Sequence, residues 1–242
     1  MMVKFILLNC NILHFSEAID SVMNFIKLKK RSTVFFLNSD CVYKSFTDNE
    51  YINVLNNADM VLPDGVGLRL IIWFFGKKML DNCNGTDFCP VLMEKLTEFR
   101  YKIFFLGGKE GVAKKAADNM RKKIPNITIV GTHSGYFKDD NQVIEKINSS
   151  GADVLFVAMG VPLQEKWIAR NREHLNPRLC LGVGALLDFL SGTIPRAPKF
   201  MRLIHLEWLW RIIIEPKRMF KRYIIDGFKL FILVIKYKFS RN

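Results

Sequence analysis

Short apolar runs alternate with amphipathic stretches along most of this chain, from residue 3 to about residue 191. This alternation is typical of α/β proteins, in which parallel strands form a central sheet and the intervening helices cover it. We therefore predict a Rossmann-like, largely parallel sheet with helices on both faces. The predicted strands are residues 3–8, 33–37, 59–62, 101–106, 127–130, 153–158 and 179–183.

The composition changes near residue 192, where we divide the chain. Residues 1–192 are predicted to form an α/β catalytic domain, and residues 193–242 a basic, amphipathic, helical appendage. The net charge is +13, and twelve basic and three acidic residues from Arg196 onward supply nine of those charges. The surface that meets an acidic partner is therefore expected in the appendage.

Several kinds of site are disfavoured by what the sequence lacks. The five cysteines are scattered without C-x-x-C spacing, which favours reduced thiols in the cytoplasm over disulfides or a zinc site. There is no Asp-x-Asp pair and no histidine spacing typical of metal ligands, so we expect no metal and no cofactor. The apolar N-terminus is interrupted by Asn9 and Asn11, and it reads as a strand better than as a signal peptide. The longest uncharged run near the C-terminus, residues 230–235, is far shorter than the ~18 residues of a spanning helix.

A carboxylate stands where one predicted strand ends. The stretch ADMVLPDGVG reads as a buried strand that stops at Pro63, Asp64 and Gly65. All three are ordinary turn residues, so one interpretation of Asp64 is structural. The other is functional, because α/β proteins keep binding and catalytic residues at the carboxyl ends of their strands.

Two further strand-to-helix turns suit substrate binding. FFLGGKEG places Gly107 and Gly108 before a helix, where backbone N–H groups can hold a phosphate; a purely structural glycine pair is the alternative. MGVPLQE places Gln164 and Glu165 in a first helical turn. The helix dipole explains Glu165. Gln164 carries an amide that both donates and accepts hydrogen bonds, which suits a sugar hydroxyl or a uracil edge.

Basic and aromatic residues are interleaved in IHLEWLWRIIIEPKRMFKR. Arg211, Arg218 and Arg222 lie seven and four residues apart, close to one helical stripe. Guanidinium groups beside Trp and Ile suggest a diphosphate-bearing, lipid-linked ligand at an anionic membrane surface. A solvated basic face is the alternative.

Eight short motifs occur in an order that resembles the WecG/TagA/CpsF family, glycosyltransferase family 26. The resemblance covers about residues 5 to 225, and each motif is weak alone but the ordered set is highly specific. The motifs are LPDGVG, NGTDF, FFLGG, VGTHSGYF, MGVPLQE, SGTIPRAP, LEWLWR and EPKR.

The resemblance implies a membrane-associated, metal-independent, inverting glycosyltransferase. Such an enzyme moves a sugar, often N-acetylmannosamine or its uronic acid, from a UDP-sugar donor to undecaprenyl-diphosphate-linked N-acetylglucosamine. It works at the inner face of the bacterial cell membrane, in synthesis of teichoic acids or other surface polysaccharides. The appendage would then bind both membrane and acceptor.

The resemblance also implies roles for particular residues. Asp64 matches the proposed catalytic base, Gln164 the family's amide position and Asn38 the asparagine of an early Thr-x-Asn motif. Arg211 and Arg218 match arginines thought to grip the acceptor diphosphate, with Lys221 or Arg222 in a third place. We also expect Gly65, Asn84 and Arg196, which lie within the shared motifs, to bind substrate.

Two departures from the family pattern keep alternatives open. Phe36 replaces the usual Thr of Thr-x-Asn, and Asn82 stands where an Arg is usual. A catalytically silent relative that binds a lipid-linked sugar is one alternative. A basic nucleic-acid-binding protein is another, disfavoured by the aliphatic runs 212–214 and 231–235, so we expect no nucleic-acid partner. An oligomer is compatible with the sequence.

Overall fold

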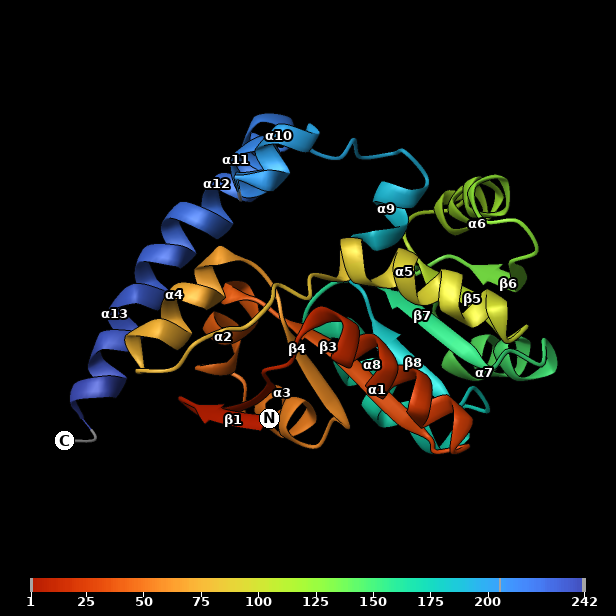
Figure 1. The fold of residues 1–242 in the computed structure, drawn as a ribbon, viewed down its shortest axis with the longest axis horizontal. Coiled ribbons are helices and arrows are strands. Elements are labelled where there is room, and N and C mark those ends of the chain that lie inside the picture. The colour runs from red at the N-terminus through yellow and green to blue at the C-terminus, as the bar shows by residue number, and fades with distance from the viewer. Residues whose placement is uncertain (1, 205, 241–242) are drawn as a thin grey trace.

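The computed structural model describes residues 2–204 and 206–240. A parallel sheet has the strand order β4-β3-β8-β7-β5-β6, with helices on both faces (Figure 1). The predicted α/β fold is therefore confirmed. The strands are β3 (Ser32–Leu37), β4 (Met60–Pro63), β5 (Lys102–Gly107), β6 (Thr128–His133), β7 (Val154–Ala158) and β8 (Leu179–Gly182).

Most of the sheet's strands are buried on both faces, which is why they read as apolar runs without a polar side. In β3, Val34 and Phe36 join one hydrophobic cluster, while Phe35 and Leu37 join the other. The first cluster includes residues of α1 (Phe15–Lys27), α5 (Gly85–Glu98), α6 (Val112–Lys123) and α9 (Leu186–Leu190). The second includes residues of α2 (Ser39–Ser45), α3 (Asn49–Asn56), α4 (Val66–Phe74), α7 (Asp140–Ser149) and α8 (Leu163–Asn171), and α8 runs into the short 3-10 helix η1 (Arg172–His174).

The predicted single strand over residues 3–8 is wrong. The chain instead forms a hairpin of β1 (Met2–Phe5) and antiparallel β2 (Leu8–Asn11), and it reverses at Ile6, which has a φ of +54°. The turn contains no Gly, Pro or Asn, so the sequence lacks the usual turn signal there. Asn11 Oδ1 accepts a hydrogen bond from the Val61 amide at 2.8 Å, which ties the hairpin to β4.

The described part of the appendage follows α9 through an extended connection (Figure 1). It folds as α10 (Lys199–Leu203), α11 (Glu207–Ile214), α12 (Pro216–Phe220), the π-helical segment η2 (Lys221–Ile225) and α13 (Asp226–Phe239). The division at residue 192 stays an interpretation. Across residues 2–204 and 206–240, no helix has both the length and the apolar character needed to cross a bilayer.

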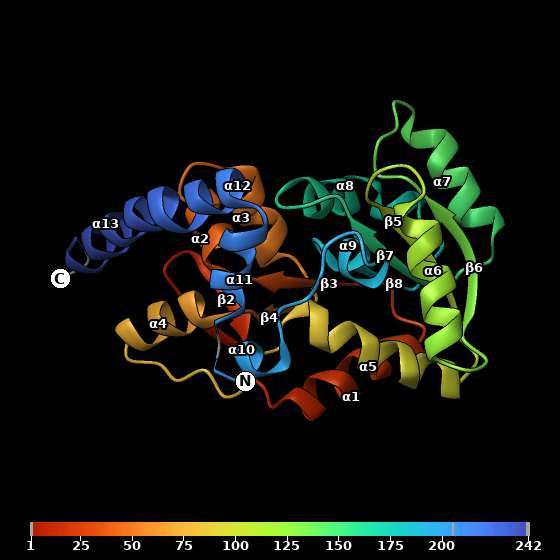
Figure 2. The same cartoon turned by 90° about the horizontal axis from the view of Figure 1, so that it is seen from above.

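The last helix of the appendage packs back on the α/β part of the chain. In Figures 1 and 2, α13 runs along one end of the molecule, and it contacts α2. Leu230 and Val234 are buried in the second hydrophobic cluster. Lys238 Nζ donates to the Phe74 carbonyl at 2.6 Å, and the Tyr237 hydroxyl donates to the Ile6 carbonyl at 2.7 Å. The appendage is therefore held against α2 and the end of α4.

Candidate active site

The predicted site residues come from several strands and lie along one edge of the sheet. Asn38 follows β3, Asp64 follows β4, Gly107 ends β5, and Gln164 lies in the first turn of α8 after β7. Because these strands are parallel, all of their carboxyl ends face the same side. The topology brings Asn38 and Asp64 together on neighbouring strands, whereas Gly107 ends β5, which lies four places from β4 in the strand order.

Asp64 is held at this edge by the neighbouring strand. Its backbone amide donates to the Leu37 carbonyl at 2.8 Å, which continues the pairing of β3 with β4. Burial raises the pKa of the Asp64 carboxyl to about 6, although the Arg222 guanidinium and a hydrogen bond with the Asn38 side chain both act to lower it. A carboxyl poised in this range is suited to accept a proton near neutral pH.

Asn82, one of the departures from the family pattern, braces the turn after Asp64. Its Oδ1 accepts a hydrogen bond from the Gly65 amide at 2.7 Å. Gly65 has a φ of +89°, a conformation that favours glycine. The structure therefore gives Gly65 and Asn82 a defined role in shaping the turn.

Phe36, the other departure, lies in the core. It is 6% exposed, and its ring packs edge-to-face on Phe88 with centroids 5.6 Å apart. A Cβ added at Gly85 would lie 3.3 Å from the Phe36 ring, so the ring fills the space at the start of α5. Its apolar character is explained by packing.

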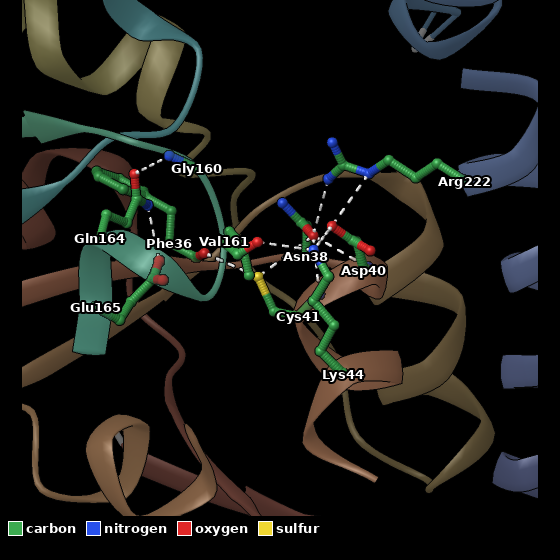
Figure 3. Close-up of polar contacts among 10 residues, drawn as sticks. All are labelled: Phe36, Asn38, Asp40, Cys41, Lys44, Gly160, Val161, Gln164, Glu165 and Arg222. Carbon is green, nitrogen blue, oxygen red and sulfur yellow. Dashed lines mark hydrogen bonds and ion pairs between the residues drawn. The ribbon is translucent and has the colours of Figure 1, made fainter. Parts of the chain in front are cut away.

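An arginine of the appendage reaches the site (Figure 3). Arg222 Nη2 donates to Asn38 Oδ1 at 3.3 Å, and Arg222 Nε lies 3.4 Å from Asp40 Oδ2. Asp40 Oδ2 also accepts from Lys44 Nζ at 2.9 Å, and Lys44 Nζ donates to the Val161 carbonyl at 2.8 Å. Of the two candidates for the third basic position, Arg222 lies beside Asn38 and acts on Asp64, whereas Lys221 is exposed.

Arg211 and Arg218 form a second cationic cluster. Glu215 Oε2 accepts from Arg211 Nη2 at 2.8 Å and from Arg218 Nη2 at 2.7 Å. Arg211 is 8% exposed and lies over the Phe189 ring, 4.9 Å from its centroid, whereas the Arg218 side chain is 59% exposed. Arg218 is therefore the more accessible of the two to a ligand.

Tyr223 is close enough to Arg222, Arg211 and Asp64 to feel their charges, and it was not singled out from the sequence. Burial raises the pKa of its hydroxyl, the charges of Arg222 and Arg211 lower it, and Asp64 raises it. Arg222 also lies over the Tyr223 ring, 5.7 Å from its centroid. In the sequence, Tyr223 is marked only by its position next to Arg222. This position does not distinguish it from the other aromatic residues of the appendage.

Gln164 has a structural role that the sequence did not suggest. It is 2% exposed, and its Oε1 accepts from the amides of Gly160 at 3.2 Å and Gly184 at 2.8 Å. Its Nε2 donates to Glu165 Oε1 at 2.7 Å (Figure 3). In this conformation Gln164 joins the loops that follow β7 and β8, and its amide is not free to bind a substrate.

Glu165 requires a correction. It lies in the first turn of α8 as expected, but it is fully buried and does not present a surface charge to the helix dipole. Burial raises the pKa of its carboxyl to about 7, with the hydrogen bond from Gln164 acting against that rise. Its carboxyl orients the Gln164 amide, so the dipole alone does not explain it.

Arg196 and Asn84 hold the appendage and α5 together. Arg196 Nη1 donates to Asp87 Oδ1 at 2.8 Å, while its Nε and Nη2 each donate to Glu207 at 3.2 Å. Asn84 caps α5 by accepting from the Asp87 amide at 2.9 Å, and it donates to Asp87 Oδ2 at 2.8 Å. Burial would raise the pKa of Asp87, but the hydrogen bonds from Arg196 and Asn84 lower it below its ordinary value. These contacts place both residues in a clamp beside the site.

A shallow cleft, open to solvent and about 430 Å³ in volume, is lined by Lys109, Glu110, Ser134 and Tyr136. The Gly135 amide donates to the Gly108 carbonyl at 2.9 Å, which places the glycine pair next to this cleft. Gly107 must lack a side chain, because a Cβ there would collide with the Ala158 carbonyl oxygen. The Gly108 amide donates to that same carbonyl at 3.0 Å, so this N–H group is already engaged. Any phosphate at this turn would therefore depend on neighbouring groups, of which Lys109 is cationic.

Comparison with known proteins links this geometry to an enzyme family. Residues 3–242 match the model of the glycosyl transferase WecG/TagA/CpsF family. An N-acetylglucosaminyldiphosphoundecaprenol N-acetyl-beta-D-mannosaminyltransferase of Bacillus spizizenii strain W23 is 32% identical over 195 residues, which are 80% of this chain and 76% of that protein. An enzyme of the same name from Bacillus subtilis strain 168 is 30% identical over 226 residues, 93% of this chain and 87% of that protein.

Proposed function

Since the chain belongs to the WecG/TagA/CpsF family of glycosyltransferases, we propose that it transfers an N-acetylmannosamine-like sugar or a uronic acid from a UDP-sugar to undecaprenyl-diphosphate-linked N-acetylglucosamine. The observation that carries this proposal is the Asp64 carboxyl, with its raised pKa, beside Asn38 and the appendage residue Arg222. A base, a hydrogen-bonding amide and a cation there suit transfer to a hydroxyl on a diphosphate-bearing acceptor.

In the proposed reaction, Asp64 accepts the proton of the acceptor hydroxyl as that oxygen attacks the anomeric carbon. The bond from the anomeric carbon to the UDP oxygen breaks, UDP leaves with the electron pair, and the anomeric configuration inverts. Asn38 orients Asp64 and Arg222 through its side chain. Positive charge from Arg222 and the second cationic cluster would stabilise diphosphate groups, and we propose that no metal ion is needed.

The donor nucleotide is assigned to the cleft beside the glycine pair. Tyr136 is 76% exposed there and offers a ring face for a base, while Lys109 offers a cation for phosphate. The cleft follows β5 and β6, at the opposite end of the strand order from β4. A donor held there would span about 19 Å of the carboxyl edge, four strand spacings, to bring its sugar to Asp64.

The appendage is assigned to the membrane and the acceptor. Leu230 and Val234 face the molecule, while exposed apolar residues lie elsewhere around η2 and α13: Ile224, Ile225, Phe228, Phe231, Ile232 and Phe239. An outward apolar face with nearby lysines is typical of a helix that lies in a bilayer interface. We propose a peripheral location on the inner face of the cell membrane, where Arg211, Arg218 and Arg222 grip the acceptor diphosphate.

The pH dependence of transfer is expected to report Asp64. Because the base must be unprotonated, kcat/KM should rise with pH and level off above about 6. Arg222→Gln removes a cation that lowers the pKa of Asp64, so the midpoint of the acid limb should move to higher pH. Lys217→Gln, an exposed basic residue on α12, is the control and should leave the midpoint unchanged. If the midpoint in Arg222→Gln equals that of wild type, Arg222 does not influence the pKa of the catalytic base.

The decisive test is incubation of the full chain with a panel of UDP-sugars and a short-chain lipid-diphosphate N-acetylglucosamine acceptor. Transfer should appear as the mass shift of one sugar on the acceptor, with UDP as the second product. Binding of the acceptor without turnover from any donor would instead identify a silent relative.

A further inference from the structure

The helix that follows Asp64 has an unpartnered apolar face. Val66, Leu70 and Trp73 of α4 are 39%, 60% and 72% exposed. Their spacing of four and three residues places them on one side of the helix, here called the α4 face. Leu68, Ile71 and Ile72 are buried on the other side, so exposure of the α4 face is not a consequence of a loosely packed helix.

Basic residues outnumber acidic ones around the α4 face, and the first acidic residue after the helix is Asp81, which His14 and the Phe15 amide engage. Residues 65–80 include Arg69, Lys77 and Lys78 and no acidic residue. Lys77 and Lys78 are exposed directly after the helix. A large apolar side chain such as tryptophan, flanked by basic residues, matches the interface of an anionic bilayer, where rings lie at headgroup depth and cations meet phosphates.

The α4 face also lies near the helix that we assign to the membrane. Lys238 of α13 donates to the Phe74 carbonyl at 2.6 Å, and its Nζ is 4.0 Å from the centroid of the Phe74 ring. The Tyr237 and Phe75 rings meet edge-to-face at 6.2 Å. The end of α4 is therefore in contact with the end of α13 (Figures 1 and 2). When α13 lies on a bilayer, the end of α4 is close to the same surface.

We propose that the α4 face docks on the anionic bilayer as a second contact beside α13, and that the two contacts together set the depth and orientation of Asp64. This proposal rests on the proposed function. A single helix on a surface leaves the protein free to roll about its axis, whereas two contacts remove that freedom. A nine-residue helix is about 13 Å long. Asp64 lies two residues before it, so docking of α4 would keep the base near the headgroups, where a lipid diphosphate lies.

The test compares Leu70→Ser/Trp73→Ser with Leu28→Ser in the full chain. Leu28 is 77% exposed at the end of α1 and serves as the matched control. On phosphatidylglycerol vesicles, the double variant should bind at least about tenfold more weakly than wild type, and the control should be unchanged. Transfer to a vesicle-embedded acceptor should fall in parallel, while transfer to a short-chain, water-soluble acceptor should be kept. Thermal melts should match, since both sites are exposed.

Contact is measured directly with brominated phosphatidylglycerol, which quenches tryptophan fluorescence at short range. Trp73→Phe keeps the face apolar and should bind like wild type, but it should lose the share of quenching that Trp73 contributes. Equal quenching in Trp73→Phe and wild type, or equal vesicle binding in the double variant and wild type, would overturn the proposal.

Three results separate this inference from the other possibilities. If wild type neither binds vesicles nor transfers sugar, the proposed function itself fails; if wild type does both and the double variant does so equally, only the α4 proposal fails. Wild type could instead sediment as a dimer and the double variant as a monomer, with equal vesicle binding. In that case the α4 face binds a second copy of the chain, and the proposal of docking on the bilayer is overturned.

Discussion

Asp64→Asn is expected to lower the rate of sugar transfer by about 10²–10⁴-fold, because the amide cannot accept the proton of the acceptor hydroxyl. The substitution should not lower the stability of the folded protein. Burial raises the pKa of Asp64 in the folded chain to about 6, above its ordinary value of 3.8, so the folded state binds the proton more tightly than the unfolded state. Its contribution to stability is therefore lost as pH rises through about 6, and a neutral side chain should leave the melting temperature at pH 7 equal or higher.

The measurement is kcat and melting temperature for the same preparation. Asp139→Asn is the matched control: Asp139 is an exposed helix cap, and asparagine caps helices equally well. The control should keep its rate. An Asp64→Asn variant that keeps more than about a tenth of the wild-type rate would exclude Asp64 as the base, given what such a base contributes.

Truncation after Ser191 is expected to abolish both vesicle binding and transfer. It removes Arg222 from Asn38 and Asp40, and it takes away the apolar outer face of α13. It also uncovers the part of the second hydrophobic cluster that Leu230 and Val234 cover, so the shortened chain should self-associate more readily. Co-sedimentation with vesicles, sedimentation velocity and a transfer assay measure the three effects.

Two full-length variants separate the roles of the appendage. Leu230→Asp/Val234→Asp should undock α13 with every basic residue retained, so that transfer falls while attraction to anionic vesicles persists. Arg218→Ala should weaken use of the acceptor more than attachment, because only one of many charges is lost. Full activity in the truncated chain, or equal loss of binding and transfer in Arg218→Ala, would mean that the diphosphate is held elsewhere.

The sequence alone was sufficient to predict those features that depend on neighbouring residues in the chain. The parallel strands are apolar runs because most are buried on both faces, and this burial is visible in composition alone. Asp64 could be placed at the end of a strand because Pro63 and Gly65 mark the turn. The hairpin over residues 2–11 could not be predicted from the sequence, because the chain turns at Ile6 without a residue that usually forms turns.

Only the tertiary structure decided which polar side chains are available to a substrate. Gln164 looks like a free amide in sequence, yet the Gly160 and Gly184 amides and Glu165 engage it in the core. Arg196 looks like another basic residue of the appendage, yet Asp87 and Glu207 engage its guanidinium. The sequence shows which chemical groups each side chain is able to bind. Which partner engages it depends on the fold, and that partner can be near or far in sequence. Glu165 is adjacent to Gln164, whereas η2 brings Arg222 to Asn38 across 184 positions and thereby sets the charge around Asp64.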